Sequence, residues 1–302
     1  MKKFFMVIAT VLCLTVGLTS FAACNTTTTN DEILVVSRES GSGTRDAFDS
    51  LVKNEAGDSL SKKADGTKYD AIVKTANIQN STGNVMTKVS TVKNAIGYIS
   101  LGSLNSTVKA ITVNGIAANA ENVLNGTYKL QRPFVIATNK KAVLTEATAD
   151  FVKYLQSSRA QTIVTANKYV EQASESTYVV PEKAISGKVV IKGSTSIDPL
   201  MDKLIADYQK IGGSKVKGVE FVKDAQGSSQ GVTAAVEDTT GTVIGMSSSK
   251  IKDNYAPSLN QFNIALDAVA VIVNNSNSIE NLTIANLYDI YTGAIKSFSN
   301  IK

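Results

Sequence analysis

The sequence has 302 residues, which is enough for two domains of ordinary size. Hydrophobic residues make up 43% and charged residues 19%, the balance of a folded globular protein. The formal net charge of +5 is too small, and the lysines are too scattered, to indicate a nucleic-acid-binding protein. The chain has no histidine, which excludes a Ser-His-Asp triad and any histidine-based zinc or iron site.

The first 24 residues have the layout of a secretory signal peptide. Lys2 and Lys3 precede an apolar stretch that is too short and interrupted for a membrane span. The stretch ends in Phe-Ala-Ala-Cys24, which resembles the bacterial lipobox, and residues 25–32 are polar enough for a flexible tether. We therefore expect lipidation at Cys24; the alternative is a cleaved signal followed by a free thiol. Cys13 lies inside the signal, so the mature chain has no disulfide.

The mature chain is expected to open with a strand, a glycine-rich loop and a helix. Residues 33–36 form a β-branched run typical of a buried strand, and residues 37–44 read Ser-Arg-Glu-Ser-Gly-Ser-Gly-Thr. Residues 45–54 follow with helical spacing of apolar side chains. Asp46 and Asp49 lie within this helix and are expected to face solvent.

The same succession of a strand, a Gly/Ser loop and a helix recurs along the chain. A strand at 188–192 leads into Gly-Ser-Thr-Ser at 193–196 and a helix at 200–208. Similar Gly/Ser loops stand at 80–83, ahead of a helix to residue 92, at 227–231, ahead of residues 232–236, and at 245–249. Further strands are expected at 95–100, 108–113, 133–137 and 268–273, and a linker at 171–187. This alternation predicts an α/β fold with mostly parallel sheets.

The Gly/Ser loops have the chemistry of an anion site. A helix N-terminus offers free N–H groups and a positive dipole end, hydroxyls add donors, and glycine lets the backbone approach a ligand. Arg38 would add a bidentate charged pair. The alternative is that the serines and threonines are ordinary N-caps, and the pattern alone leaves both readings open. Neither a P-loop nor a dinucleotide-binding GxGxxG sequence is present in these loops.

Several segments closely resemble the substrate-binding protein of bacterial phosphate ABC transporters. The matching segments cover nearly all of the mature chain and are residues 33–48, 95–98, 132–133, 193–201, 245–249, 264–274 and 281–293. The resemblance implies a periplasmic-binding-protein-like fold of type II, with two α/β lobes and a ligand cleft between them. It also implies a protein that captures inorganic phosphate and delivers it to the permease subunits of an ABC importer, with no enzymatic activity, cofactor or metal.

The order of these segments differs from the family's. In the family the Gly-Ser-Thr-Ser segment comes first, whereas here it stands at residue 193, after the Ser-Arg-Glu segment at 37. The chain order is therefore circularly permuted, or the gene fuses pieces of two tandem copies. Permutation implies an Arg-bearing lobe of residues 33–103 with 271–302 and a second lobe of 104–270, with the family's own ends joined through 171–187. Such a rearrangement is tolerated where termini lie close together.

The resemblance also implies which residues contact phosphate. Contacts are expected from Arg38, Ser42, Gly43 and Thr44 of one lobe and from Thr195, Ser196, Ser228 and Ser248 of the other. Weaker candidates are Ser81 and Thr82, at the start of a helix. Closure of the lobes would dehydrate the anion.

Two positions depart from the family pattern. Many members carry Asp where this chain has Ser248; that Asp accepts the proton of hydrogen phosphate and so rejects sulfate. Here a hydroxyl, or another acid such as Glu39, Asp46 or Asp198, must take its place. The acid that often stands two residues after the Arg is Ser40 here, so Arg38 is held by Glu39 or less firmly.

The resulting interpretation is a lipoprotein on the extracellular face of the membrane, as in bacteria of the Gram-positive type. The alternatives are a phosphate sensor or surface adhesin, a binder of another tetrahedral oxyanion such as sulfate or arsenate, and an enzyme such as a phosphoesterase. The absence of histidine and of clustered acids argues against the enzyme.

Overall fold

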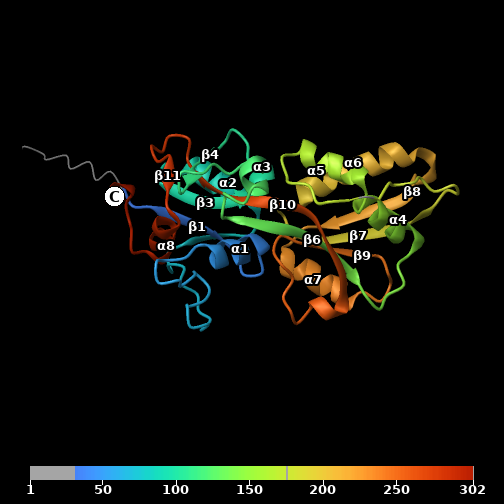
Figure 1. Ribbon diagram of the computed structural model, residues 1–302, viewed down its shortest axis with the longest axis horizontal. Coiled ribbons are helices and arrows are strands. Elements are labelled where there is room, and N and C mark those ends of the chain that lie inside the picture. The colour runs from blue at the N-terminus through green and yellow to red at the C-terminus, as the bar shows by residue number, and fades with distance from the viewer. Residues whose placement is uncertain (1–30, 175, 302) are drawn as a thin grey trace, which may run out of the picture. The chain divides into compact units, whose positions relative to one another are not determined.

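The computed structural model describes residues 31–174 and 176–301 (Figure 1). The expected signal peptide, Cys24 and tether residues 25–30 lie outside the described residues, so their assignment stays a prediction.

One mixed sheet of nine strands organises the described chain, with the order β2-β1-β3-β10-β6-β9-β7-β8 and β4 beside β10. The sequence predicts mostly parallel strands; the structure differs because β10 runs antiparallel to β3, β4 and β6, and β6 runs antiparallel to β9. A separate pair joins β5 and β11. The bounds are β1 Leu34–Arg38, β2 Asn77–Gln79, β3 Ala95–Ser100, β4 Lys109–Ala110, β5 Thr112–Val113, β6 Gln131–Asn139, β7 Ser186–Gly193, β8 Gly218–Asp224, β9 Val243–Ser247, β10 Leu259–Val273 and β11 Asn281–Leu282.

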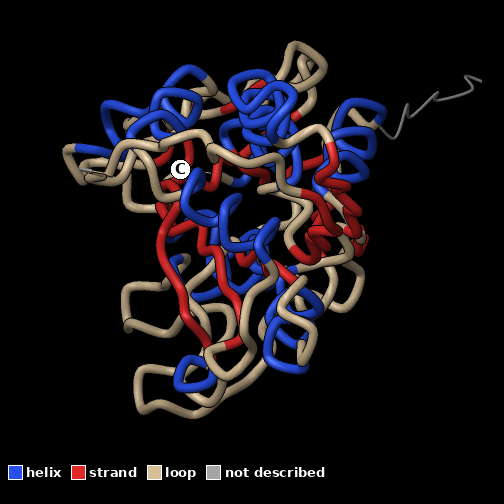
Figure 2. Tube along the Cα trace, turned by 90° about the vertical axis from the view of Figure 1, so that its right-hand side faces the viewer, coloured by secondary structure: helices blue, strands red, loops and turns tan. Residues whose placement is uncertain are grey.

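Helices follow most of the parallel strands and pack beside them (Figures 1 and 2). Their bounds are α1 Gly43–Leu51, α2 Thr82–Thr91, α3 Ala120–Leu124, α4 Glu146–Leu155, α5 Ser158–Ala166, α6 Asp198–Gly212, α7 Ser228–Glu237 and α8 Ile284–Thr292. Among them, α1 comes next after β1, α2 after β2, α6 after β7 and α7 after β8. Of the expected linker, residues 171–187, the last two belong to β7, whereas residues 171–174 and 176–185 contain no helix or strand.

The buried apolar side chains form separate groups on the two halves of the sheet. One group surrounds β1, β3 and the end of β10, where Phe48 of α1 stacks on Tyr98 at 4.0 Å between ring centroids. It also takes in Ile111, Val113 and Val123. Another surrounds β6, β7 and β9, with Phe151 of α4 among its aromatic members.

Strands β6 and β10 run through both groups. Leu130, just before β6, belongs to the first group, and Phe134 of β6 belongs to the second. On β10, Ala265 lies in the second group and Ala268 in the first. Because the two strands pair along most of their length, residues 131–133 and 266–268 mark the crossing between the groups.

The two ends of the described chain lie side by side. The Ile33 N–H donates to the Lys296 carbonyl at 2.8 Å, and Glu32 forms an antiparallel bridge with Ser297. The segment that opens the described chain is therefore tied to the segment that closes it.

Candidate anion-binding site

The Gly/Ser loops singled out in the sequence meet at one place. They follow the C-terminal ends of β1, β2, β7, β8 and β9, and four of them lead into the N-termini of α1, α2, α6 and α7. Strands β1 and β2 are parallel, as are β7, β8 and β9, so within each set the loops share one edge of the sheet. This edge is where open α/β sheets usually bind ligands.

Arg38, the last residue of β1, is the charged centre of this place and is only 2% exposed. Its Nε and Nη2 donate to the two carboxylate oxygens of Glu39 at 2.7 and 2.8 Å. Nη2 also donates to Thr195 Oγ1 at 3.1 Å, and Nη1 to Thr82 Oγ1 at 3.4 Å. Glu39 therefore holds Arg38, which is the first of the two alternatives that Ser40 left open, and the guanidinium still reaches hydroxyls of two other loops.

Four hydroxyls from three loops lie against one another beside Arg38. The Thr44 and Ser196 oxygens are 2.8 Å apart, and Thr82 Oγ1 lies 3.2 Å from Ser196 Oγ and 3.4 Å from Thr195 Oγ1. Thr44, Thr82 and Ser196 are buried. Thr82, a weaker candidate in the sequence, is thus as central as the stronger ones. Each hydroxyl can donate or accept, so the cluster can orient its protons toward an anion.

Gly43, Ser228 and Ser248 form the other side of the cluster. The Ser248 N–H donates to Ser228 Oγ at 3.0 Å, and the two hydroxyl oxygens are 3.3 Å apart. A Cβ on Gly43 would lie 2.5 Å from Ser228 Oγ and 2.8 Å from Ser248 Oγ. Glycine is therefore required here for the close approach of α1 to the two serines.

The two remaining candidates act as helix caps. Ser42 Oγ accepts from the Arg45 N–H at the start of α1, and Ser81 Oγ accepts from the Asn84 N–H at the start of α2. These bonds occupy an acceptor site of each hydroxyl but not its proton. Ser42 is buried next to Gly43, whereas Ser81 lies half-buried at the rim.

The acids proposed as substitutes for the family's Asp lie differently. Asp198 pairs with Lys223 at 2.8 Å, and Asp46 lies 4.0 Å from Lys252. Glu39 is the one of the three that contacts Arg38. Both oxygens of Glu39 are engaged by Arg38, whereas the hydroxyls of Ser228 and Ser248 lie against Gly43 and that of Ser196 lies against Thr44.

Asp49 does not face solvent, contrary to the expectation from its helical spacing. It is 6% exposed, and Arg45, one turn earlier in the same helix, donates from Nε to its Oδ2 at 3.1 Å. Burial raises the pKa of Asp49 to about 7 in spite of this partner. Asp46 is half-buried, and burial raises its pKa as well.

Two residues of the site were missed in the sequence. Tyr98 accepts from the Arg38 N–H at 3.2 Å and bonds Ser37 at 2.8 Å, so it fixes the end of β1. Arg132 donates from Nη1 to the carbonyl of Ser248 at 3.1 Å. The Arg-Pro pair at 132–133 was a visible signal, but only the fold connects it to Ser248.

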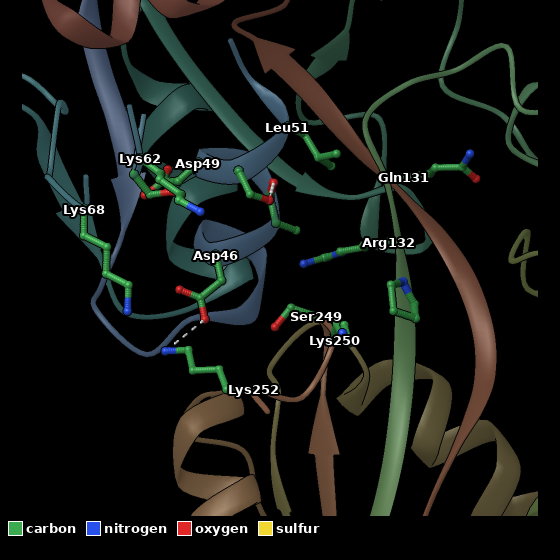
Figure 3. A pocket seen from close by; sticks show the side chains of 14 residues that line it. Asp46, Asp49, Leu51, Lys62, Lys68, Gln131, Arg132, Ser249, Lys250 and Lys252 are labelled. Carbon is green, nitrogen blue, oxygen red and sulfur yellow. Dashed lines mark hydrogen bonds and ion pairs between the residues drawn. The ribbon is translucent and has the colours of Figure 1, made fainter. Parts of the chain in front are cut away.

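A cavity of about 470 Å³ lies beside the site (Figure 3). Its lining joins α1, the loop at 61–68, the start of β6 and the loop after β9, and includes Asp46, Lys62, Lys68, Arg132, Lys250 and Lys252. No group of three His, Cys, Asp or Glu that could hold a metal ion occurs in the described ranges. Within those same ranges, no helix has the length and apolar character needed to cross a membrane.

The model of the PBP superfamily domain matches residues 23–159 and 179–300. Phosphate-binding protein PstS 2 of Streptococcus pneumoniae serotype 4 is 40% identical over 272 residues, which cover 89% of this chain and 88% of that protein. PstS 2 of Streptococcus agalactiae serotype V is 37% identical over 289 residues, or 94% of each chain.

A solved structure is similar as well. The crystal structure of a phosphate-binding protein of a phosphate ABC transporter from Streptococcus pneumoniae TIGR4 is 40% identical. The match covers 90% of this chain and 100% of that one, with a TM-score of 0.67. The likeness thus extends over both halves of the sheet.

Proposed function

The chain belongs to the PBP superfamily and, within it, to the family of the phosphate-binding proteins of ABC transporters, and from this premise we propose that it captures inorganic phosphate and delivers it to an ABC importer. The observation that carries the proposal is that Arg38, paired with Glu39, contacts the hydroxyls of Thr82 and Thr195 from two other loops, beside the bonded hydroxyls of Thr44 and Ser196. This arrangement offers a tetrahedral anion one charged fork and donors from several directions.

The proposed contacts are the eight residues expected from the sequence together with Thr82. Arg38 donates to the anion with its charge partly balanced by Glu39, and Thr44, Thr82, Thr195 and Ser196 surround it with hydroxyls. Gly43 brings the first N–H groups of α1 close, and Ser228 and Ser248 complete the set. A buried anion needs such a full set of donors because it leaves its water behind.

We propose two lobes that close on the ligand. The two groups of buried side chains support this division, and bonds such as Thr44 to Ser196 cross it. Since Ile111, Val113 and Val123 pack with Tyr98, we assign residues up to about 130 to the Arg-bearing lobe rather than ending it at 103. The lobes would then be linked by β6 and β10, and closure would bend these strands.

The permuted order has two supports. The bonds between residues 32–33 and 296–297 bring the ends together, as permutation in a surface loop requires. The PstS 2 alignments extend over 88–94% of the relatives, so a shared order along the whole chain accounts for them. We therefore infer that the order is genuine and common to these relatives.

Binding proteins of ABC importers work outside the cytoplasmic membrane, and we propose that Cys24 anchors this one by a lipid. The tether would then end at β1, which carries Arg38. Cys24→Ser should release the protein from cell membranes into the medium, measured by fractionation and immunoblotting. Retention of the variant in the membrane fraction would contradict the anchor.

Ser248 favours a second ligand class. Without an acid at this position, sulfate lacks the repulsion that an Asp would supply, so sulfate is the principal competing ligand. Titration calorimetry with phosphate, arsenate and sulfate tests the proposal directly. Phosphate binding is expected to be tightest, and a chain that binds none of the three has another function.

Transport is tested in the cell. Deletion of the gene should lower phosphate uptake, and wild-type protein should restore it. Normal uptake in the deletion strain, with phosphate binding intact, would favour a sensor or adhesin. Turnover of a chromogenic phosphate ester by the purified protein would favour an enzyme.

A further inference from the structure

Arg132 and Asp267 form a buried ion pair at the crossing between the two halves of the sheet. They face each other in the antiparallel register of β6 and β10, at the point where both strands leave one group of buried side chains for the other. Their side chains are 1% and 0% exposed, and Arg132 donates to Asp267 Oδ2 from Nε at 3.2 Å and from Nη2 at 3.0 Å.

The third nitrogen of the same guanidinium reaches the candidate site. Nη1 of Arg132 donates to the Ser248 carbonyl at 3.1 Å, and Figure 3 shows Arg132 extending from its strand toward the segment at Ser249. Ser248 is also tied to Ser228 through its N–H and lies against Gly43. One planar group therefore joins the crossing strands to a loop that supplies a proposed ligand contact.

Stability alone gives no reason for such a pair. Replacing a buried ion pair by apolar side chains of similar volume is often neutral or stabilising, because two charges must be removed from water. The planar fork of Arg, unlike the ammonium of Lys, can bind a carboxylate on one side and a carbonyl on another. The pair is therefore better explained by the geometry that it imposes.

We propose that Arg132, oriented by Asp267, is a positioning residue that sets the place of Ser248 for ligand binding without touching the ligand. The inference rests on the proposed phosphate binding. Because the pair lies where the two lobes are linked, the position of Ser248 depends on the geometry of the linking strands β6 and β10. Ser248 is therefore aligned for the ligand when these two strands have the geometry described here.

The test uses the full mature protein and titration calorimetry with inorganic phosphate and with sulfate. Arg132→Lys keeps the charge but loses the fork, and Arg132→Met combined with Asp267→Leu removes both charges without leaving one unpaired. Both are expected to weaken phosphate binding about tenfold or more, the scale seen when outer hydrogen-bond partners of metal ligands are removed. The ratio of phosphate to sulfate affinity should also change.

Arg159→Lys is the matched control. Arg159 pairs with Asp207 on the second half of the sheet, away from the site. The Arg159 side chain is 45% exposed, so Arg159→Lys should lower the thermal unfolding midpoint no more than the Arg132 variants do, and it should leave phosphate affinity unchanged.

A double-mutant cycle separates positioning from general damage. If Arg132 acts through Ser248, then Arg132→Lys should cost much less affinity in a Ser248→Ala background than in the wild type. Equal costs in both backgrounds, or wild-type affinity in both Arg132 variants, would overturn the inference while leaving phosphate binding intact. Failure of the wild type to bind phosphate would instead overturn the proposed function, and the inference with it.

Discussion

At the scale of single residues, we expect Arg38 to determine whether the site holds an anion. It is buried, paired with Glu39 and in contact with hydroxyls of two other loops. Removing it leaves Glu39 as an unbalanced carboxylate beside the proposed ligand. The loss therefore includes both a donor and the charge that offsets an acid.

Arg38→Ala is expected to weaken phosphate binding by about 2–4 kcal/mol, the cost of truncating one partner of a buried charged contact. Arg38→Lys should recover only part of this loss, since an ammonium cannot contact Glu39, Thr82 and Thr195 together as the fork does. Calorimetry measures both variants. Unchanged affinity in Arg38→Ala would remove Arg38 from the site.

We expect Ser248 to set the selectivity between phosphate and sulfate. An Asp at this position would accept a proton from hydrogen phosphate and repel sulfate, which has none to give. Ser248→Asp should therefore raise the ratio of phosphate to sulfate affinity by tenfold or more, about 1.4 kcal/mol. Competition of sulfate against labelled phosphate measures the ratio; an unchanged ratio would mean that another group accepts the proton.

We expect Asp49 to make the stability of the protein depend on pH. Burial raises its pKa from 3.8 to about 7, so between these values the folded state holds a proton that the unfolded chain has lost. Stability contributed by this group is therefore full below about pH 4 and falls as pH rises toward 7, by at most about 4 kcal/mol. Asp49→Asn should flatten this part of the profile in chemical denaturation between pH 4 and 8. An equally steep profile in the variant would assign the dependence to another group, such as Asp267, whose pKa burial raises to about 6.

At the scale of elements, the start of α1 is the most constrained segment. Gly43 has no positive φ, so its role is the close approach to Ser228 and Ser248 rather than an unusual backbone. If those serines belong to the other lobe, a side chain at residue 43 obstructs closure of the lobes but causes no strain in the open protein. A substitution there should then lower ligand affinity without lowering the stability of the ligand-free protein.

Gly43→Ala is expected to lower phosphate affinity at least tenfold while the unfolding midpoint of the ligand-free protein stays the same or rises, since Ala favours helix. Gly83→Ala is the matched control, because Gly83 is also near a helix start but its Cβ would meet only Ser81 Oγ, at 4.0 Å. Equal affinities in the two variants would contradict the close approach.

The local sequence pattern was sufficient to locate some helices and strands but not others. The strand at 95–100 is one buried run and was located correctly. The expected strand at 108–113 is broken into β4 and β5, because its two parts pair with different strands. β10 is much longer than the expected strand at 268–273, since its first half carries polar residues along its pairing with β6. Helix α4 went unpredicted although its apolar side chains repeat at helical spacing.

The site shows the same limit. Each Gly/Ser loop and Arg38 were recognisable in the sequence, because glycine, hydroxyls and a helix start are local features. Their meeting was implied only by the family resemblance, since Thr44 and Ser196 are 152 positions apart and no local feature relates them. Arg132 was hidden for the same reason, because its partner at Ser248 is set by the pairing of β6 with β9 and β10.

At the scale of the whole molecule, the fold suggests a test of the order in which the segments follow one another along the chain. Residues 32–33 and 296–297 are already bonded, so a short Gly/Ser linker can join these ends without displacing a strand. The segment at 182–184 is exposed and lies outside helices and strands, so new ends can open there.

A rearranged chain that begins at Lys183, runs to residue 300, crosses the linker to Glu32 and ends at Glu182 should fold and bind phosphate within about twofold of the wild type, because every proposed contact is kept. Opening the chain instead between Ser40 and Gly41 cuts the loop that leads from Arg38 into α1, and should abolish binding even where circular dichroism shows a folded protein. The pair of variants separates the order of the chain from the integrity of the site. If the first variant keeps its secondary structure but loses binding, then the chain ends beside Lys296 are needed in their present place. The present order of segments would then not be interchangeable with other orders of the same fold.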